Sequence, residues 1–149
     1  MVVLAEKGGV DVLALRRSRP RVGEVPFESA TKYMATFHMD GDEVLVCVKG
    51  APDVLLARSV AMAVGESARH ALTESAGAAL ADANSDLANQ GLRVLAVASR
   101  RVPAEEAIVD GVVADPDRWT TDLVLEALVG ILDPARPEAR DAIAECHTA

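Results

Sequence analysis

The residues best suited to hold a nucleotide lie in two short stretches, 26–34 and 49–52. Each stretch contains a lysine, and the first also contains aromatic side chains. The whole chain has only four aromatic residues, and three of them fall in or beside the first stretch: Phe27, Tyr33 and Phe37. Nucleobases stack on aromatic rings, and lysines pair with phosphates. The two stretches therefore indicate a nucleotide site in outline.

A β-hairpin is predicted around Asp40-Gly41, because Asp-Gly between two alternating runs is a strong signal for a two-residue turn. With this pair at the tip, Phe37 faces Val44 and one face of the hairpin is apolar throughout. Lys32 then stands directly opposite Lys49 at the open end. Like charges so placed repel each other, and a triphosphate between them would relieve the repulsion. The alternative is two solvated lysines on an exposed edge, and the spacing alone does not decide.

Four short motifs follow one another across most of the chain. They are Pro26-Phe27-Glu28-Ser29 with Lys32, Val48-Lys49-Gly50-Ala51-Pro52-Asp53, Gly91-Leu92-Arg93-Val94-Leu95-Ala96, and Gly130-Ile131-Leu132-Asp133-Pro134 with Arg136 and Pro137. In type and order they resemble the nucleotide-binding (N) domain of P-type cation-transporting ATPases. The most similar class is that of the calcium and sodium/potassium pumps (type II), because the His-Pro motif of heavy-metal pumps does not occur in the sequence.

The resemblance implies a role for each residue that matches a motif. Phe27 corresponds to the aromatic residue on which adenine stacks. Lys32 and Lys49 correspond to the lysines that line the adenosine and phosphate side of the pocket, and Gly50 and Ala51 to the close-approach turn beside it. Without the resemblance, Phe27 would be better explained as a core aromatic.

Three further residues are matched by position. Arg93 corresponds to an arginine that reaches the phosphates. Asp133 and Arg136 correspond to hinge residues near the catalytic centre of the assembled pump. Two departures from the family pattern are expected to weaken binding: a family glutamate that touches adenine is not found at the start of this sequence, and Ser29 stands where some members have a phosphate-facing arginine.

The resemblance implies a domain that binds ATP or ADP and presents ATP to an aspartate outside this chain, which couples hydrolysis to cation transport. The Asp-Lys-Thr-Gly-Thr run that carries this aspartate is absent from the sequence, so the chain is expected to bind ATP without hydrolysing it. The implied partners are the phosphorylation and actuator domains of the pump, and the former would mainly supply magnesium. The alternative is a stand-alone regulatory or interaction module of the same fold without a nucleotide role.

Composition restricts the class of protein. The chain has 149 residues, half of them hydrophobic, and a formal net charge of −8. One domain is expected at this length. The acidic balance argues against nucleic-acid binding, which needs a basic stripe. No apolar run is long enough to span a bilayer, so the fragment itself is predicted to be soluble and without direct membrane contact. It is also expected to be a monomer, and the resemblance implies that it is a cytoplasmic domain of an integral membrane protein.

The two cysteines, Cys47 and Cys146, are far apart and form no metal-binding pattern, so buried or free thiols are expected and no metal site is predicted. The predicted fold is α/β of the α+β type, an antiparallel twisted sheet flanked by helices. Helices are predicted near residues 2–7, 10–17, 52–58 and 66–90, strands near 22–27, 92–101 and 123–132, and a loop over 103–117. Residues 1–133 are assigned to the nucleotide-binding domain, with a truncated amino-terminal edge. Residues 134–149 are assigned to the hinge and the truncated start of the phosphorylation domain.

Overall fold

The computed structural model describes residues 2–65, 68–132 and 146. Its helices are α1 (Val2–Lys7), α2 (Val12–Ser18), α3 (Pro52–Arg58), α4 (Glu74–Asn89) and α5 (Ala104–Ala107), with a 3-10 helix η1 (Pro116–Thr120). Its strands are β1 (Arg21–Val25), β2 (Tyr33–Asp40), β3 (Glu43–Gly50), β4 (Ser59–Val64), β5 (Ala68–Ala71), β6 (Arg93–Pro103), β7 (Ile108–Val109), β8 (Val112–Val113) and β9 (Leu123–Ile131).

A seven-stranded sheet forms the centre of the molecule, in the order β1-β2-β3-β6-β9-β4-β5. Its pairs are antiparallel except for β4 with β9, which is parallel. Strands β7 and β8 form a separate two-stranded sheet. The predicted α+β fold, a mostly antiparallel sheet with flanking helices, is confirmed. Among the described residues, no helix combines the length and the apolar character needed to cross a membrane.

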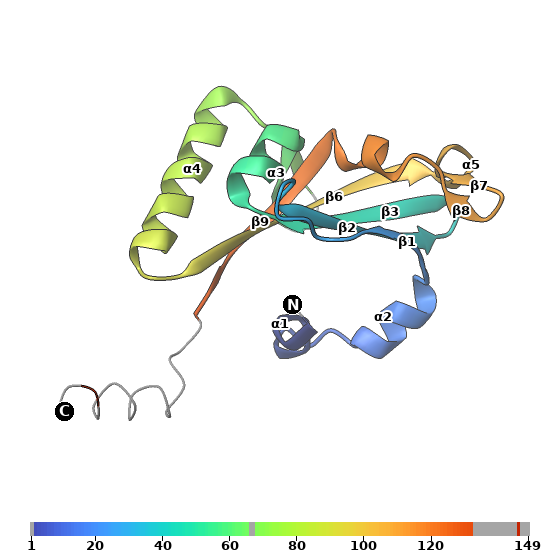
Figure 1. Cartoon of the computed structure of the whole chain (residues 1–149), viewed down its shortest axis with the longest axis horizontal. Coiled ribbons are helices and arrows are strands. Elements are labelled where there is room, and N and C mark those ends of the chain that lie inside the picture. The colour runs from blue at the N-terminus through green and yellow to red at the C-terminus, as the bar shows by residue number, and fades with distance from the viewer. Residues whose placement is uncertain (1, 66–67, 133–145, 147–149) are drawn as a thin grey trace.

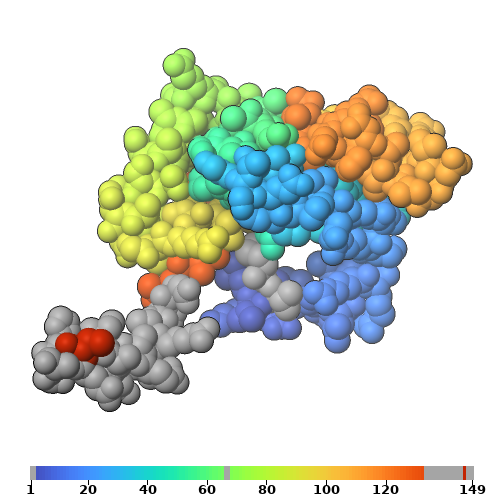
Figure 2. Space-filling view, viewed as in Figure 1, coloured from blue at the N-terminus to red at the C-terminus, as the bar shows by residue number. Residues whose placement is uncertain are grey.

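The two faces of the sheet differ in what covers them. Helices α3 and α4 lie over one face, while α1 and α2 lie on the opposite side (Figure 1). The core is on the α3 side and includes the alternating residues Tyr33, Ala35 and Phe37 of β2, as well as Leu55 of α3. In the space-filling view, α1 (dark blue) and α2 (lighter blue) project from the body of the molecule (Figure 2). The other face of the sheet is therefore less completely covered.

The β2–β3 hairpin forms where it was predicted, but the predicted register was wrong. Asp40 pairs with Glu43, so the two-residue loop is Gly41-Asp42, and Phe37 faces Val46. Gly41 has φ +68°, and glycine at the first loop position is typical of a type II′ turn.

The observed register keeps Asp40 in the strand, where its carboxylate pairs with two arginines. The distances are 3.0 Å to Arg19 and 2.8 Å to Arg101. Both registers place the same residues on the apolar face, because they differ by two positions and side chains alternate with period two. The turn and these ion pairs therefore distinguish the two registers, and the hydrophobic pattern does not.

Two other predicted segments need correction. The helix predicted over 66–90 begins only at Glu74, where the Thr73 hydroxyl accepts a hydrogen bond from the amide of Ala76. Residues Ala68–Ala71 before it form the exposed edge strand β5. The predicted loop over 103–117 contains α5, β7, β8 and the start of η1. Short elements of this kind carry too few residues to show a period in the sequence.

Candidate functional site

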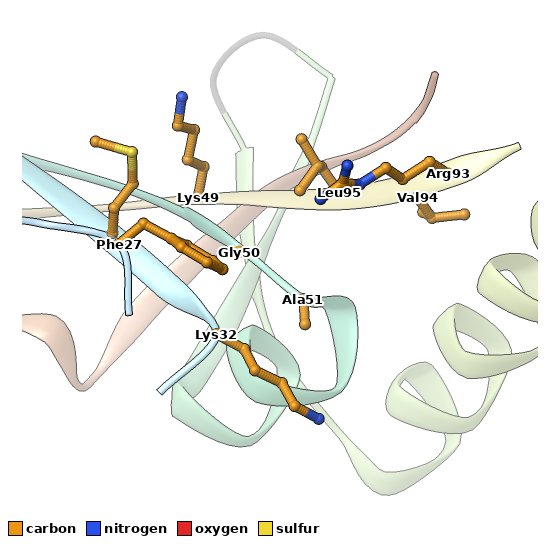
Figure 3. A pocket seen from close by; sticks show the side chains of 9 residues that line it. Phe27, Lys32, Lys49, Gly50, Ala51, Arg93, Val94 and Leu95 are labelled. Atoms are coloured by element: carbon orange, nitrogen blue, oxygen red, sulfur yellow. The ribbon is translucent and has the colours of Figure 1, made fainter. Parts of the chain in front are cut away.

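Three separate segments of the chain meet around one cavity of about 450 Å³ at the open end of the β2–β3 hairpin. Its lining consists of Phe27, Lys32, Met34, Lys49, Gly50, Ala51, Arg93, Val94 and Leu95 (Figure 3). The six nucleotide-site residues predicted from the sequence are all among them. The volume lies within the range of small-molecule pockets, roughly 300–1,000 Å³.

Phe27 is the aromatic residue of this pocket. It follows β1 in the chain, and 57% of its surface is exposed. The interpretation of Phe27 as a core aromatic is therefore wrong. The other two aromatic residues of the segment, Tyr33 and Phe37, are buried on the opposite face of the sheet. A single ring thus faces the cavity with its surface available for stacking.

The two lysines do not stand opposite each other. Met34 is the partner of Lys49 across the hairpin, and Lys32 precedes the first residue of β2. In Figure 3 the two lysine side chains extend away from each other. The predicted repulsion between directly opposed lysines is therefore absent, and it cannot serve as the reason for an anion site.

The charge of the pocket lining is nevertheless one-sided. Its nine residues include three cations, Lys32, Lys49 and Arg93, and no carboxylate. Lys32 has a distant partner just outside the lining, with its Nζ 3.8 Å from the carboxylate of Asp53. Within the described part of the chain, Lys49 and Arg93 form no ion pair. On a chain of net charge −8, the lining is a local positive region suited to an anion.

Gly50 is required by the close approach of two backbones. A Cβ at this position would lie 2.6 Å from the carbonyl oxygen of Lys32 and 2.6 Å from the Cβ of Tyr33. The next amide, that of Ala51, donates to the same Lys32 oxygen at 3.0 Å. Lys32 itself has φ +59°, a left-handed conformation that is uncommon for residues other than glycine. The segment around Lys32 is thus fixed to the start of the Gly50-Ala51 turn.

Three apolar lining residues were not predicted as part of the site: Met34, Val94 and Leu95. Strand alternation could have identified Met34, because it lies on the same face of the hairpin as Lys49. A second cavity of about 220 Å³ shares Met34 and Lys49 with the first and extends along the sheet to Cys47. Burial raises the pKa of the Cys47 thiol, so this cysteine is a weak nucleophile at neutral pH.

The remaining sequence predictions concern a metal site, the two cysteines and the hinge residues. Among the described residues, no group of three or more His, Cys, Asp or Glu side chains is placed to hold a metal ion. Cys47 and Cys146 are both free thiols. Asp133 and Arg136, predicted as hinge residues, lie outside the described residues, as does most of the predicted hinge segment 134–149.

Comparison with known proteins identifies similar sequences over the whole chain. A family model described as "P-type ATPase, cytoplasmic domain N" matches residues 1–138. The chain is 36% identical over 150 aligned residues to the cation-transporting ATPase pma1 of Synechocystis sp., and 33% identical over 150 to a calcium-transporting ATPase of Listeria monocytogenes. Each match covers 100% of this chain and 16% of the relative.

A human relative is also similar. The potassium-transporting ATPase alpha chain 2 of Homo sapiens is 32% identical over 147 aligned residues, which cover 93% of this chain and 14% of the relative. The chain therefore spans about one sixth of the length of the curated bacterial relatives that it matches.

Proposed function

The chain belongs to the family of P-type ATPase cytoplasmic N domains, and from this membership we propose that its pocket binds ATP through the adenine ring and the phosphates. Phe27 provides the stacking surface for the base. Lys49, Lys32 and Arg93 provide positive charge for the phosphates. In the parent protein this domain presents ATP to an aspartate of the phosphorylation domain, and the energy of the aspartyl phosphate drives cation transport.

One observation carries this proposal: an exposed ring and three cations line one cavity without a carboxylate, on a chain of net charge −8. If the charged residues of the lining were ordinary surface charges, carboxylates would be expected among them, because the protein has an excess of acidic residues. A lining whose charged residues are all cations favours a phosphorylated ligand, and the adjacent ring favours a ligand with a flat base.

The chain is proposed to bind the nucleotide and not to hydrolyse it. The described residues hold no cluster of metal-ligating side chains, so the phosphates are neutralised by lysine and arginine and magnesium adds little to the affinity. We expect dissociation constants for ATP and ADP in the high micromolar to millimolar range, which correspond to roughly 4 to 6 kcal/mol. Incubation of the purified chain with ATP should release no phosphate above a buffer blank.

A titration followed by amide NMR tests the proposal. ATP should shift the resonances of Phe27, Lys32, Lys49 and Gly50, with and without magnesium. Adenosine and inorganic triphosphate are the matched controls, because each offers one half of the contacts and should bind more weakly than ATP. Nanomolar affinity, or binding that disappears without magnesium, would contradict this version of the site. Shifts that are absent with all three ligands would favour an interaction module without a nucleotide role.

A further inference from the structure

A polar cluster that is buried at its centre and exposed at its edge lies on the opposite face of the sheet from the pocket. It consists of Tyr33 at the start of β2, Arg58 at the end of α3, and Asp117 and Thr120 in η1. Tyr33 is 2% exposed and Thr120 is fully buried. A buried polar group that loses its partner is costly, so the members of such a cluster hold one another in place. The cluster joins three elements that are distant in the sequence.

The hydrogen bonds of Thr120 show how Tyr33 is held. The Thr120 hydroxyl donates to the Asp117 carbonyl oxygen at 2.8 Å and accepts from Arg58 Nη1 at 3.1 Å. A hydroxyl has one donor and two acceptor sites, so the Tyr33 hydroxyl, 3.2 Å away, can only donate to the remaining one. Its single proton is shared between this oxygen and a carboxylate oxygen of Asp117 at 3.4 Å. The guanidinium of Arg58 also lies 4.5 Å from the centre of the Tyr33 ring. Both ends of the Tyr33 side chain are thus fixed.

Tyr33 lies in the chain between two residues of the pocket lining, Lys32 and Met34, while its own side chain is buried in the core. Tyr33 directly follows Lys32 and pairs with Gly50 across the hairpin. A Cβ on Gly50 would lie 2.8 Å from the Tyr33 Cα, so no space separates the two backbones. Lys32, with φ +59°, keeps a sparsely populated conformation that persists only where the surroundings impose it. A displacement of Tyr33 would therefore displace both Lys32 and Gly50.

We propose that Tyr33 is a positioning residue for the nucleotide site. Held by Thr120 and Arg58 on the covered face, it fixes Lys32 and Gly50 on the open end of the hairpin in the arrangement that binds ATP. The inference rests on the proposed function. Its physical basis is preorganisation: a site that is already in its binding conformation loses less entropy when the ligand binds.

Four variants test the proposal. Tyr33→Phe and Thr120→Val each remove one hydroxyl of the cluster and keep the shape of the side chain. Thr120→Ser keeps the hydroxyl and is the conservative rescue. Ser59→Ala is the matched control, because its hydroxyl, bonded to the Leu55 carbonyl oxygen at 2.7 Å, lies at the same end of α3 but outside the cluster. Each variant is titrated with ATP by amide NMR, and its thermal melt is recorded.

Tyr33→Phe and Thr120→Val should weaken ATP about three- to tenfold, the range that follows from the loss of one net hydrogen bond. In both variants the amide resonances of Lys32 and Gly50 should shift in the absence of ligand. Thr120→Ser and Ser59→Ala should bind ATP like the wild type. The resonance shifts at Lys32 and Gly50 separate positioning from a general loss of stability, which the melts report.

Two results would overturn the inference: an unchanged affinity in Tyr33→Phe, or an equal loss in Ser59→Ala, which would show that any missing hydroxyl in this region has the same effect. If Thr120→Val fails to fold, Tyr33→Phe and the Thr120→Ser rescue still decide. Failure of the proposed function gives a different result, because the wild type itself then shows no ATP-dependent shifts. In that case, unchanged Lys32 and Gly50 resonances in ligand-free Tyr33→Phe would also refute positioning.

Discussion

The two faces of the β2–β3 hairpin are built for different purposes. On the covered face, six alternating side chains are each at most 2% exposed: Tyr33, Ala35, Phe37, Val44, Val46 and Val48. On the other face, Met34, Thr36, Cys47 and Lys49 are only partly buried and line cavities. The difference implies that stability resides on the first face, and the proposed function assigns ligand binding to the second. Substitutions on the two faces should therefore have separable effects.

The two ends of the same hairpin differ in how their cations are neutralised. At the turn end, Arg101 lies 2.8 Å from a carboxylate oxygen of Asp40 and 2.9 Å from one of Glu43. At the open end, Lys49 and Arg93 form no ion pair within the part of the chain that the structure describes. The arginine at the turn is satisfied by the protein itself, whereas the cations at the pocket are available to an external anion.

The two phenylalanines give the largest expected contrast between the faces. Phe37→Ala removes a fully buried ring and should reduce the free energy of unfolding by about 3–5 kcal/mol. Phe27→Ala removes a ring that is 57% exposed and should change it by no more than about 0.5 kcal/mol. Urea denaturation of both variants measures the difference directly.

Phe27→Ala should affect ATP binding much more than it affects the free energy of unfolding. Loss of the stacking ring should weaken ATP by about 1–3 kcal/mol, while the affinity for inorganic triphosphate stays unchanged. If Phe27→Ala unfolds, the ring contributes to stability after all. If the variant binds ATP with wild-type affinity, the base lies elsewhere. Either result would contradict the assignment of stability and binding to different faces at this residue.

A smaller contrast is expected between cations at the two ends of the hairpin. Lys49→Met keeps most of the aliphatic packing and should weaken ATP by about 1.5–3 kcal/mol, the value of a hydrogen bond to a charged group. Arg101→Met at the turn end is the control and should leave ATP affinity unchanged. Calorimetric titration of both variants distinguishes a local contact from a general effect of net charge, because each variant loses one positive charge. Equal losses of ATP affinity in the two variants would mean that the overall electrostatic field of the protein attracts the ligand, and not a local contact with Lys49.

The grouping of these residues around one pocket could be predicted because they lie in short motifs that resemble those of a known family, and because the aromatic residues and lysines are few. Four aromatic residues in 149 make the position of Phe27 informative, and Lys49-Gly50-Ala51-Pro52 opens a helix by its residue types alone. The relative placement of Lys32 and Lys49 could not be predicted in the same way. Alternation fixes which face a residue occupies, but two registers that differ by two positions fit it equally well.

The missed strand β5 illustrates a different limit. Ala68–Ala71 carries alanine, arginine and histidine and is exposed along its length, so it has neither β-branched residues nor an alternating pattern to mark a strand. It is a strand because it pairs antiparallel with β4, where Val64 lies opposite Ala68, and not because of a pattern of its own. Thr73 was a usable signal that the helix begins later, since threonine is a preferred N-cap.

The smallest expected effect concerns Asp40 at the turn end. Hydrogen bonds from Arg19 and Arg101 lower the pKa of this carboxyl below its ordinary value. The folded state therefore binds a proton less readily than the unfolded chain, whose aspartates titrate near pH 3.9. The contribution of Asp40 to stability is fully present above that pH and is lost as the pH falls through the lowered folded value.

Thermal melts of the wild type and Asp40→Asn should thus differ at pH 6 and converge as the pH falls below about 4. ATP affinity at pH 6 should be the same in both proteins, because Asp40 is at the far end of the hairpin from the pocket. A difference in melting temperature that stays constant down to pH 2 would show that Asp40 acts through packing and not through its charge.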